Sequence, residues 1–335
     1  MWGATFEPVR TYKITALKRI LKYLLLAFLF LISVFVIQNY PASSDAKDLP
    51  HLSDTSHLRE NLELITHTTA ARSYQNIDVL DTVAERIRQE FLKSTSRVSF
   101  QNYKVDGKDY KNVIASFGPE KGERIILGAH YDVCGNQEGA DDNASGTAGI
   151  LELARLLKDQ NLKYRIDLVT YTLEEPPYFN TREMGSYIHA KSLHDANIPV
   201  KGMISIEMIG YYSDEENSQH YPIGIMKWIY GKKGDYITIV QKSICGSFAK
   251  QFKDLAFKNN SIPTKAFRAP FFLGGISLSD HKNYWKFGYS AVMVTNTAFF
   301  RNQNYHEETD KLATLNIPKM AQTVDGIFRT LTSLE

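Results

Sequence analysis

Hydrophobic positions follow two periodic patterns after a first apolar stretch. Five short apolar runs are typical of β-strands, and several are nearly continuous, as expected of central strands covered on both faces. These runs lie at residues 112–116, 124–129, 166–172, 202–206 and 290–295. The remaining hydrophobic positions recur at helical spacing, at residues 58–65, 77–91, 147–157, 183–193, 239–257 and 315–334. This alternation predicts an α/β fold, a three-layer α/β/α sandwich around a mixed, mostly parallel central sheet.

The amino-terminal apolar stretch is interpreted separately. The run 23–37 is apolar except for Ser33, and five basic residues precede it. We expect one helix over residues 20–38 that serves as a single-pass transmembrane anchor or as a cleaved export signal. A buried core helix is disfavoured because no charged residue interrupts the run. In both export cases the basic segment 1–19 stays in the cytoplasm. The catalytic part is then expected to be membrane-anchored outside the cytoplasm, periplasmic in a bacterium, or secreted.

Composition narrows the domain organisation. Residues 39–56 are rich in Pro, Ser and Asp without a hydrophobic period, which predicts a linker, and residues 57–335 are then one large domain. A hydrophobic fraction of 43% suffices for its core, and a formal net charge of +2 argues against a nucleic-acid binder. Cys134 and Cys245 are too few for a disulfide framework, so one disulfide or two free thiols are the alternatives.

Polar side chains that a core does not need follow four of the five predicted strands. Sites in open α/β sheets form at the carboxyl ends of strands, so these residues are expected to gather. They are His130 and Asp132, then Glu174 and Glu175, then Glu207, and after a short loop His306. Asp142 stands in the segment 139–146 (GADDNASG), just before a predicted helix. An ordinary helix cap is the alternative there, but a doubled aspartate exceeds what a cap requires. Imidazole and carboxylate together indicate zinc.

The chain resembles the co-catalytic di-zinc aminopeptidase family, similar to bacterial leucyl aminopeptidases and related to glutamate carboxypeptidase and glutaminyl cyclase. The resemblance covers residues 57–335. The motifs that carry it are HYD (130–132), GADDNASG (139–146), TLEEPP (172–177), IEMIG (206–210), SDH (279–281) and NYHEETD (304–310).

The resemblance implies a role for each matching residue. Asp142 would bridge two zinc ions, with His130 and Glu207 completing one site and Glu175 and His306 the other. Glu174 would be the general base of a metal-activated water. Asp132 would accept the second N–H of the His130 ring. Asp280 and His281 would line or brace the cleft, and both, with Tyr305, are candidates for substrate contact. An aromatic group could wall a pocket for an apolar side chain, with core packing as the alternative use of these residues, namely Phe267, Phe271, Phe272 and Tyr305.

Two departures from the family pattern leave alternatives open. Glu207 stands where the aminopeptidases usually have aspartate, so one zinc is the alternative to two. A longer segment, residues 176–186, replaces the usual Gly-rich turn after Glu175 and is expected to shape the substrate pocket.

The implied function is that of a zinc-dependent aminopeptidase acting on peptide substrates. The alternatives are a glutaminyl cyclase-like acyltransferase with one zinc, a carboxypeptidase, for which the sequence identifies no basic clamp, and a non-catalytic binding ectodomain. The non-catalytic alternative is disfavoured because all six matching positions carry side chains that can bind metal or act as a base. These positions are the five ligand candidates and Glu174.

Overall fold

A nine-stranded mixed sheet forms the centre of the computed structural model, which describes residues 9–40, 42–224, 226–270 and 275–334. The strands are β1 (Ser43–Ser44), β2 (Val98–Val105), β3 (Lys108–Phe117), β4 (Arg124–His130), β5 (Arg165–Tyr171), β6 (Val200–Glu207), β7 (Ile237–Lys242), β8 (Thr264–Ala269) and β9 (Ala291–Thr295). Their order across the sheet is β1-β8-β7-β9-β6-β4-β5-β3-β2. The central strands β5, β4, β6 and β9 pair in parallel. The predicted α/β class with a mixed, largely parallel sheet is therefore confirmed.

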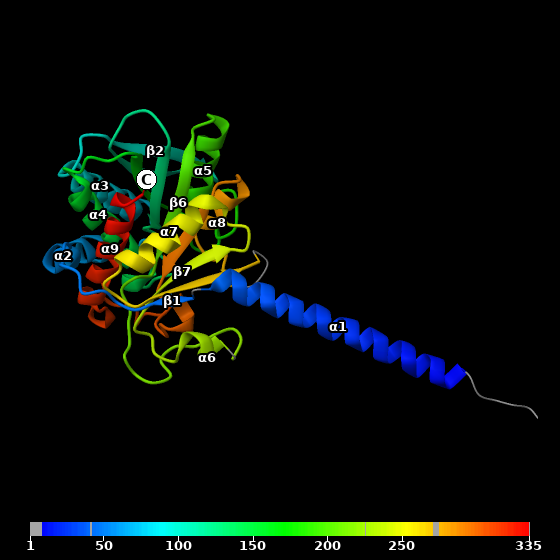
Figure 1. Cartoon of the computed structure of the whole chain (residues 1–335). Coiled ribbons are helices and arrows are strands. Elements are labelled where there is room, and N and C mark those ends of the chain that lie inside the picture. The colour runs from blue at the N-terminus through cyan, green and yellow to red at the C-terminus, as the bar shows by residue number, and fades with distance from the viewer. Residues whose placement is uncertain (1–8, 41, 225, 271–274, 335) are drawn as a thin grey trace, which may run out of the picture. The chain divides into compact units, whose positions relative to one another are not determined.

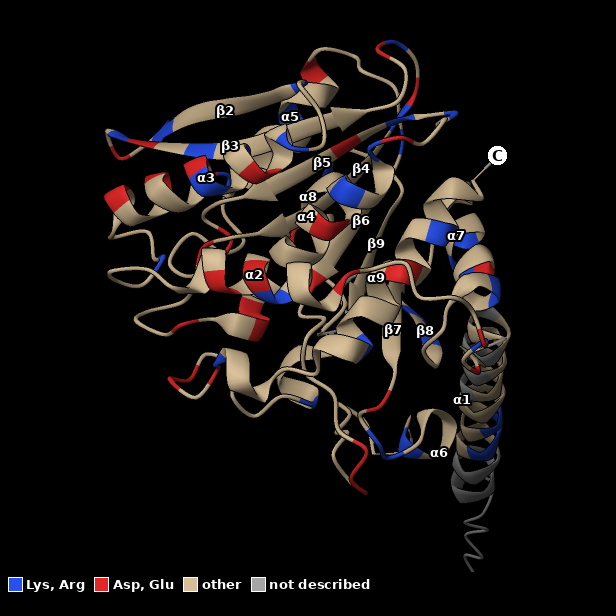
Figure 2. Ribbon diagram, turned by 90° about the vertical axis from the view of Figure 1, so that its left-hand side faces the viewer, with Lys and Arg blue, Asp and Glu red and all other residues tan. Residues whose placement is uncertain are grey.

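All five predicted strands are present, as β3, β4, β5, β6 and β9. Every residue of β9 is buried, as is all of β4 and β5 after the first residue. Charged residues on these central strands are few and stand mostly near strand ends, so the middle of the sheet in Figure 2 is largely uncharged. Burial on both faces explains why near-continuous apolar runs marked these strands.

One helical prediction is wrong in part. Residues 239–257 were expected to form a helix, but the stretch begins inside β7, and helix α7 starts only at Gly246. The segment ITIVQK is rich in β-branched residues and all but its last residue are buried, which favours a strand between two neighbours. The sequence pattern also did not predict β1, β2 and β8.

Helices cover both faces of the sheet (Figure 1). One face carries α2 (Thr55–Thr66), α3 (Ile77–Leu92), α4 (Gly146–Leu157), α7 (Gly246–Asn259) and α9 (Ile317–Thr332). The other face carries α5 (Gly185–Asp195) and α8 (His281–Lys286), packed through a smaller cluster that includes Leu193 and Tyr284. A short helix, α6 (Met226–Tyr230), lies in the long connection between β6 and β7. The predicted layers on both sides of the sheet are thus present.

The predicted amino-terminal helix is present as α1 (Val9–Asn39), longer than the expected residues 20–38. Helix α1 belongs to one unit of the chain, and a second unit begins at Ala42. No helix within the described residues combines the length and apolarity needed to cross a membrane. Helix α1 includes the basic positions Lys18, Arg19 and Lys22 in its own turns.

The predicted linker, residues 39–56, is for the most part attached to the second unit. Ser43 and Ser44 pair with β8, and the buried Asp325 carboxylate on α9 accepts hydrogen bonds from the backbone N–H groups of Leu52 and Ser53. Asp54 then caps α2, which starts two residues before the expected domain boundary. These hydrogen bonds hold the backbone of this polar stretch in place, although its sequence has no hydrophobic period.

Candidate metal centre

Three adjacent parallel strands bring the predicted metal ligands to one edge of the sheet. His130 is the last residue of β4, and Glu207 is the last residue of β6 on one side of it. On its other side β5 ends at Tyr171, three residues before Glu174 and four before Glu175. The positions of all four side chains agree with the rule that sites form at the carboxyl ends of such strands.

Asp142 lies between two imidazole–carboxylate pairs. Its Oδ1 is 3.3 Å from His130 Nε2, which is 3.5 Å from Glu207 Oε1. Its Oδ2 is 3.2 Å from His306 Nε2, which is 3.2 Å from Glu175 Oε2. Ligand atoms about 2.0–2.1 Å from a tetrahedral zinc ion lie roughly 3.3 Å apart. The spacing of both groups therefore suits two cations that share one carboxylate.

Several buried ligand atoms have no hydrogen-bond partner within the described residues. They are Asp142 Oδ2, Glu175 Oε1 and His306 Nε2. Four of the five ligand candidates are buried, and only the His306 side chain is partly exposed, at 25%. Burying unpaired polar atoms is costly, and a bound cation would satisfy all three. The donor set thus fits a metal ion.

The charged groups at this edge of the sheet shift one another's pKa values strongly. Burial and the Asp142 charge raise the pKa of Glu175 to about 8. Burial alone would raise the pKa of Asp142 as well, but its interactions with the His130 and His306 rings hold that pKa below its ordinary value. Burial opposes the charged form of His306, yet its two carboxylate partners raise its pKa to about 11. Carboxylates this close require positive charge, whether from imidazolium or from a metal.

Glu174 stands beside this group without belonging to its closest pairs. Its Oε2 lies 3.8 Å from His130 Nε2, and the residue is 5% exposed. Burial raises its pKa well above the ordinary value, and the charges of Glu175 and Glu207 add to this shift although His130 opposes it. A carboxylate with a raised pKa is suited to accept and return a proton.

Asp132 supports the site differently from the prediction. The His130 Nδ1 hydrogen bond goes to the backbone carbonyl of Asp132 at 3.2 Å, and the carboxylate lies 3.5 Å away. That carboxylate instead accepts the backbone N–H groups of Glu174 and Glu175, at 3.2 and 3.1 Å. Because both of its oxygens are used in this way, Asp132 fixes the loop that presents the two glutamates.

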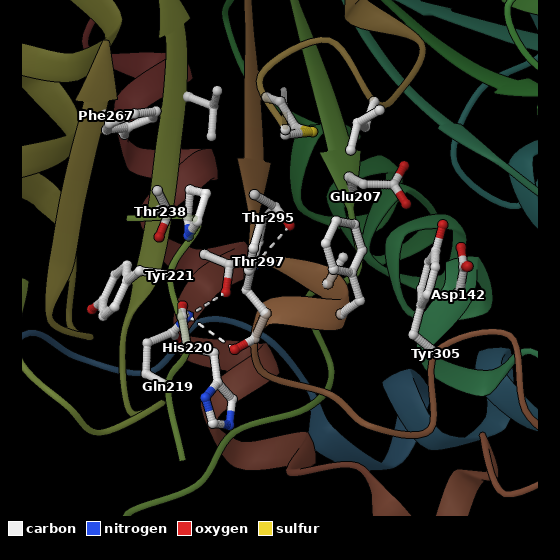
Figure 3. Close-up of a pocket in the computed structure, with 18 of the residues that line it drawn as sticks. Asp142, Glu207, Gln219, His220, Tyr221, Thr238, Phe267, Thr295, Thr297 and Tyr305 are labelled. Atoms are coloured by element: carbon white, nitrogen blue, oxygen red, sulfur yellow. Dashed lines mark hydrogen bonds between the residues drawn. The ribbon is translucent and has the colours of Figure 1, made fainter. Parts of the chain in front are cut away.

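A cavity of about 170 Å³ opens beside the metal-ligand candidates (Figure 3). Its lining includes Asp142, Glu174, Glu175, Glu207 and His306, and it continues over β9, β7 and β8. Pro176 and Phe179 also line it, so the longer segment after Glu175 shapes the pocket as expected. Of the predicted aromatic wall, Phe267 and Tyr305 line the cavity, whereas Phe271 and Phe272 lie outside the described residues.

Known proteins share both the sequence pattern and the architecture around these residues. The model of Peptidase family M28 matches residues 112–331, which include every ligand candidate described above. The chain belongs to peptidase family M28. It is 40% identical over 323 residues to the "Uncharacterized protein YfbL" of Escherichia coli (strain K12), a match that covers 94% of this chain and 99% of that protein.

More distant relatives carry activity names. Leucine aminopeptidase 1 of Uncinocarpus reesii is 25% identical over 301 residues, covering 82% of this chain and 69% of that protein. The crystal structure of the Legionella pneumophila LapA aminopeptidase aligns with a TM-score of 0.64 at 20% identity, covering 84% of this chain and 72% of that one. A glutaminyl cyclase structure from Bacteroides thetaiotaomicron aligns with a TM-score of 0.65 at 16% identity, covering 86% and 100%. These two structural likenesses establish the fold.

The first aspartate of the M28 motif GADDNASG has a structural task that the sequence did not reveal. The Asp141 carboxylate is fully buried and accepts hydrogen bonds from the backbone of Gly210 and from the side chains of Asn296 and Asn302. Asp310, the last residue of NYHEETD, accepts the backbone N–H groups of both aspartates at 2.9 and 3.0 Å. The doubled aspartate in GADDNASG and the final aspartate of NYHEETD were the sequence signals that could have revealed these supporting roles.

Ser279 is a second residue that the sequence interpretation missed. Its hydroxyl donates to Glu207 Oε2 at 2.7 Å, which leaves Oε1 directed toward His130. The longer side chain of Glu207 thus reaches the metal-ligand group while its other oxygen is held. In this M28 chain Ser279 is the first residue of the motif SDH, of which only the other two residues were selected.

Asp280 and His281 do not line the cavity, which leaves the predicted bracing role in place of direct substrate contact. Both are fully buried, and neither is among the described residues that line the cavity. His281 Nε2 instead lies 2.7 Å from the carbonyl of Ile276, and its ring meets Trp285 edge to face. Tyr305 does line the cavity and stacks on His306, with 3.8 Å between ring centroids.

Cys134 and Cys245 are both free thiols. Cys134 Sγ lies within 4.8 Å of ligand atoms of Glu175 and His306, so a thiol adjoins the second imidazole–carboxylate pair. The sequence left one disulfide or two free thiols as alternatives, and it did not place Cys134 near the site. Its place two residues after Asp132 was the signal that it belongs near the site.

Proposed function

We propose that this M28 chain is a zinc-dependent aminopeptidase that hydrolyses the first peptide bond of peptides. The observation that carries the proposal is the position of Asp142, whose two oxygens face separate imidazole–carboxylate pairs at 3.2 and 3.3 Å. His130 and Glu207 would hold one zinc ion, and Glu175 and His306 the other. Bound there, zinc would polarise the scissile carbonyl and lower the pKa of a water molecule.

The chain's own residues would perform the remaining steps. Glu174 takes a proton from the attacking water and returns it to the departing amine, since it is buried beside the ligands and its pKa is raised. Asp132 keeps Glu174 in place through the backbone N–H groups. The cavity would hold the side chain of the first substrate residue.

The test uses the full chain loaded with zinc and a panel of aminoacyl-nitroanilides. We expect release of nitroaniline, and we expect Glu174→Gln to lower kcat by at least about a hundredfold while zinc content stays unchanged. If Glu174→Gln keeps full activity, the proposed mechanism is refuted. Cleavage of amino-blocked peptides, without cleavage of free-amine substrates, would instead identify a carboxypeptidase.

A glutaminyl cyclase-like acyltransferase is the second candidate, and Glu207 is the observation that favours it. A glutamate at this position departs from the usual aspartate, and the fold likeness extends to a glutaminyl cyclase at a TM-score of 0.65. Elemental analysis separates the two candidates. About two zinc ions per chain together with nitroaniline release support the aminopeptidase, whereas one zinc ion and cyclisation of an amino-terminal glutamine support the cyclase.

We also propose that the amino-terminal apolar run directs export of the peptidase unit from the cytoplasm. The run 23–37 with its preceding basic residues supports this, because such a flank is retained on the cytoplasmic side. A fusion of residues 1–56 to alkaline phosphatase, which folds only after export from a bacterial cytoplasm, should be active. An inactive fusion would refute export, and the amino-terminal sequence of the exported product shows whether the run is cleaved.

A further inference from the structure

The floor of the cavity beside the metal-ligand candidates is a row of residues in register across four strands. Glu207 on β6 pairs with Thr295 on β9, Thr295 with Thr238 on β7, and Thr238 with Lys265 on β8. Residues paired in this way on adjacent strands point to the same face of the sheet. All four line the cavity. The row therefore leads from a metal-ligand candidate to a lysine.

The cavity is long in the direction of this row. Neighbouring strands lie about 4.8 Å apart, so three steps separate the backbones of Glu207 and Lys265 by roughly 14 Å. In Figure 3, Glu207 and Asp142 lie at one end, Phe267 and Tyr221 at the other, and Thr295 and Thr238 between them. A ligand held at the metal end would thus extend a side chain across β9 and β7 toward β8.

The sides of the cavity are mostly apolar. The register two residues further along the strands places Met293, Val240 and Phe267 side by side, and all three line the cavity. Tyr221 and Tyr230 add aromatic surface. Such walls favour a slender hydrocarbon chain and leave few polar groups to interact with the ligand.

Lys265 is the cation at the far end. Its Nζ donates to the carbonyl of Tyr230 and lies 3.3 Å from the centre of the Tyr236 ring. Within the described part of the chain it forms no ion pair with a carboxylate, although Asp235 is near enough to favour its charge slightly. Burial lowers its pKa to about 8, which means that its positive charge lacks full compensation.

A second cation adjoins the same end. Arg301 is 2% exposed and lies 4.6 Å from the Tyr236 ring, where it donates to the side chain of Gln219 and to the carbonyl of Tyr236. Its Nη2 has no hydrogen-bond partner among the described residues. Thr238, in the floor between the two ends, likewise has an unpartnered buried hydroxyl. The far end is therefore electropositive, whereas carboxylates crowd the metal end.

We infer that the cavity selects substrates whose first residue has an acidic side chain, glutamate above all, and that Lys265 determines this specificity. The inference rests on the proposed aminopeptidase function. A free amino group would lie toward the carboxylates at the metal end, and the side-chain carboxylate would lie toward Lys265. Glutamate fits better than aspartate because the extra methylene group reaches further along the apolar walls. A buried cation left without an opposite charge is costly, so the site discriminates strongly against substrate side chains that carry no negative charge.

The experiment compares nitroanilides of glutamate, glutamine, leucine and methionine with the zinc-loaded full chain. We expect the highest kcat/KM for glutamate. Lys265→Met should lower kcat/KM for glutamate by about tenfold or more, with leucine and methionine unchanged or improved, and Lys265→Arg should retain the glutamate preference. Lys250→Met, on the exposed side of α7, is the matched control and should alter none of the four.

Two kinetic outcomes would overturn the inference. One is a wild-type preference for leucine over glutamate of about tenfold or more, and the other is an equal loss of kcat/KM for all substrates in Lys265→Met.

If no nitroanilide is cleaved, the proposed function fails, and the pocket is tested by calorimetry with free glutamate and norleucine. In that case, tighter binding of glutamate that Lys265→Met abolishes supports the inference, and equal binding of the two ligands refutes it. Thermal melting of each variant verifies that it is folded.

Discussion

Asp142 is the residue on which the proposed metal centre depends most. Among the described residues, Asp142 is the carboxylate that forms ion pairs with both histidines, and one of its oxygens has no other partner there. An asparagine would keep the shape of the side chain but would replace one acceptor oxygen with a donor. The effect of losing it should therefore extend to both halves of the centre.

We predict that Asp142→Asn loses zinc after dialysis, with an affinity reduced by more than about a hundredfold. Elemental analysis of the purified protein measures the zinc content directly. Asp159→Asn, at an exposed position after α4, serves as the control and should retain the zinc content of the wild type. Equal zinc in Asp142→Asn and wild type would show that Asp142 does not bind metal.

Ser279 tests the role of the weaker ligand candidate, Glu207. Without its hydroxyl, Glu207 Oε2 would lose a 2.7 Å hydrogen bond and the carboxylate would be free to turn. We predict that Ser279→Ala weakens zinc binding by about tenfold, as is usual when a partner of a metal ligand is removed. Competition with a fluorescent zinc chelator measures the affinity. Ser192→Ala on α5 is the control, and no difference between the two variants would contradict the role assigned to Ser279.

At the scale of the elements, His57 joins three helices on one face of the sheet. On α2, its ring nitrogens lie 2.6 Å from Glu152 on α4 and 2.9 Å from Glu90 on α3. Hydrogen bonds with Glu152 and then Glu90 raise its pKa to about 9. Because the pKa is raised in the folded state, the stabilisation from these two ion pairs is fully present below the unfolded pKa of about 6.5. It is lost as the pH rises through about 9.

We predict that His57→Gln lowers the free energy of unfolding near neutral pH by about 1–2 kcal/mol, a value discounted because the ring is partly exposed. Urea titrations of both proteins between pH 6 and 10 measure the difference. It should shrink above pH 9, where the wild-type imidazole is neutral. A difference that stays constant across this range would rule out the proposed ion pairs.

For the whole molecule, the metal centre exists only in the folded state. Its ligand candidates come from the ends of β4, β5 and β6, from the turn before α4 and from the loop after β9. Metal bound to such a site stabilises the folded chain by mass action. Removal of zinc should therefore affect the stability of the entire second unit, Ala42–Glu335.

We predict that zinc at a hundredfold excess over its Kd raises stability by about 2.7 kcal/mol and Tm by roughly 5 °C or more, relative to chelator-treated protein. Calorimetry with and without chelator measures this shift. Asp142→Asn should show a much smaller one, which serves as the control. An unchanged Tm in the wild type would mean that zinc does not bind the folded state selectively.

The sequence by itself determined the α/β class, five strands and the main candidate residues of the site. It could do so because central strands must be apolar on both faces, and because polar residues at their ends are conspicuous against that background. His130, Glu174, Glu175 and Glu207 follow directly from this contrast. The edge strands β1 and β2, and β8 next to β1, escaped detection, since strands with partly exposed residues or only two residues carry a weaker signal.

Only the tertiary structure decided which residues support the site and what the cavity contains. Ser279 reaches Glu207 through the packing of a loop onto β6, and Asp310 reaches the backbone of Asp142 from 168 residues away. Lys265 entered the cavity only through the register of β8 beside β7, which no local pattern reveals. Local periodicity reports which residues are buried, but the contacts among distant segments depend on strand order and register, which arise when the chain folds.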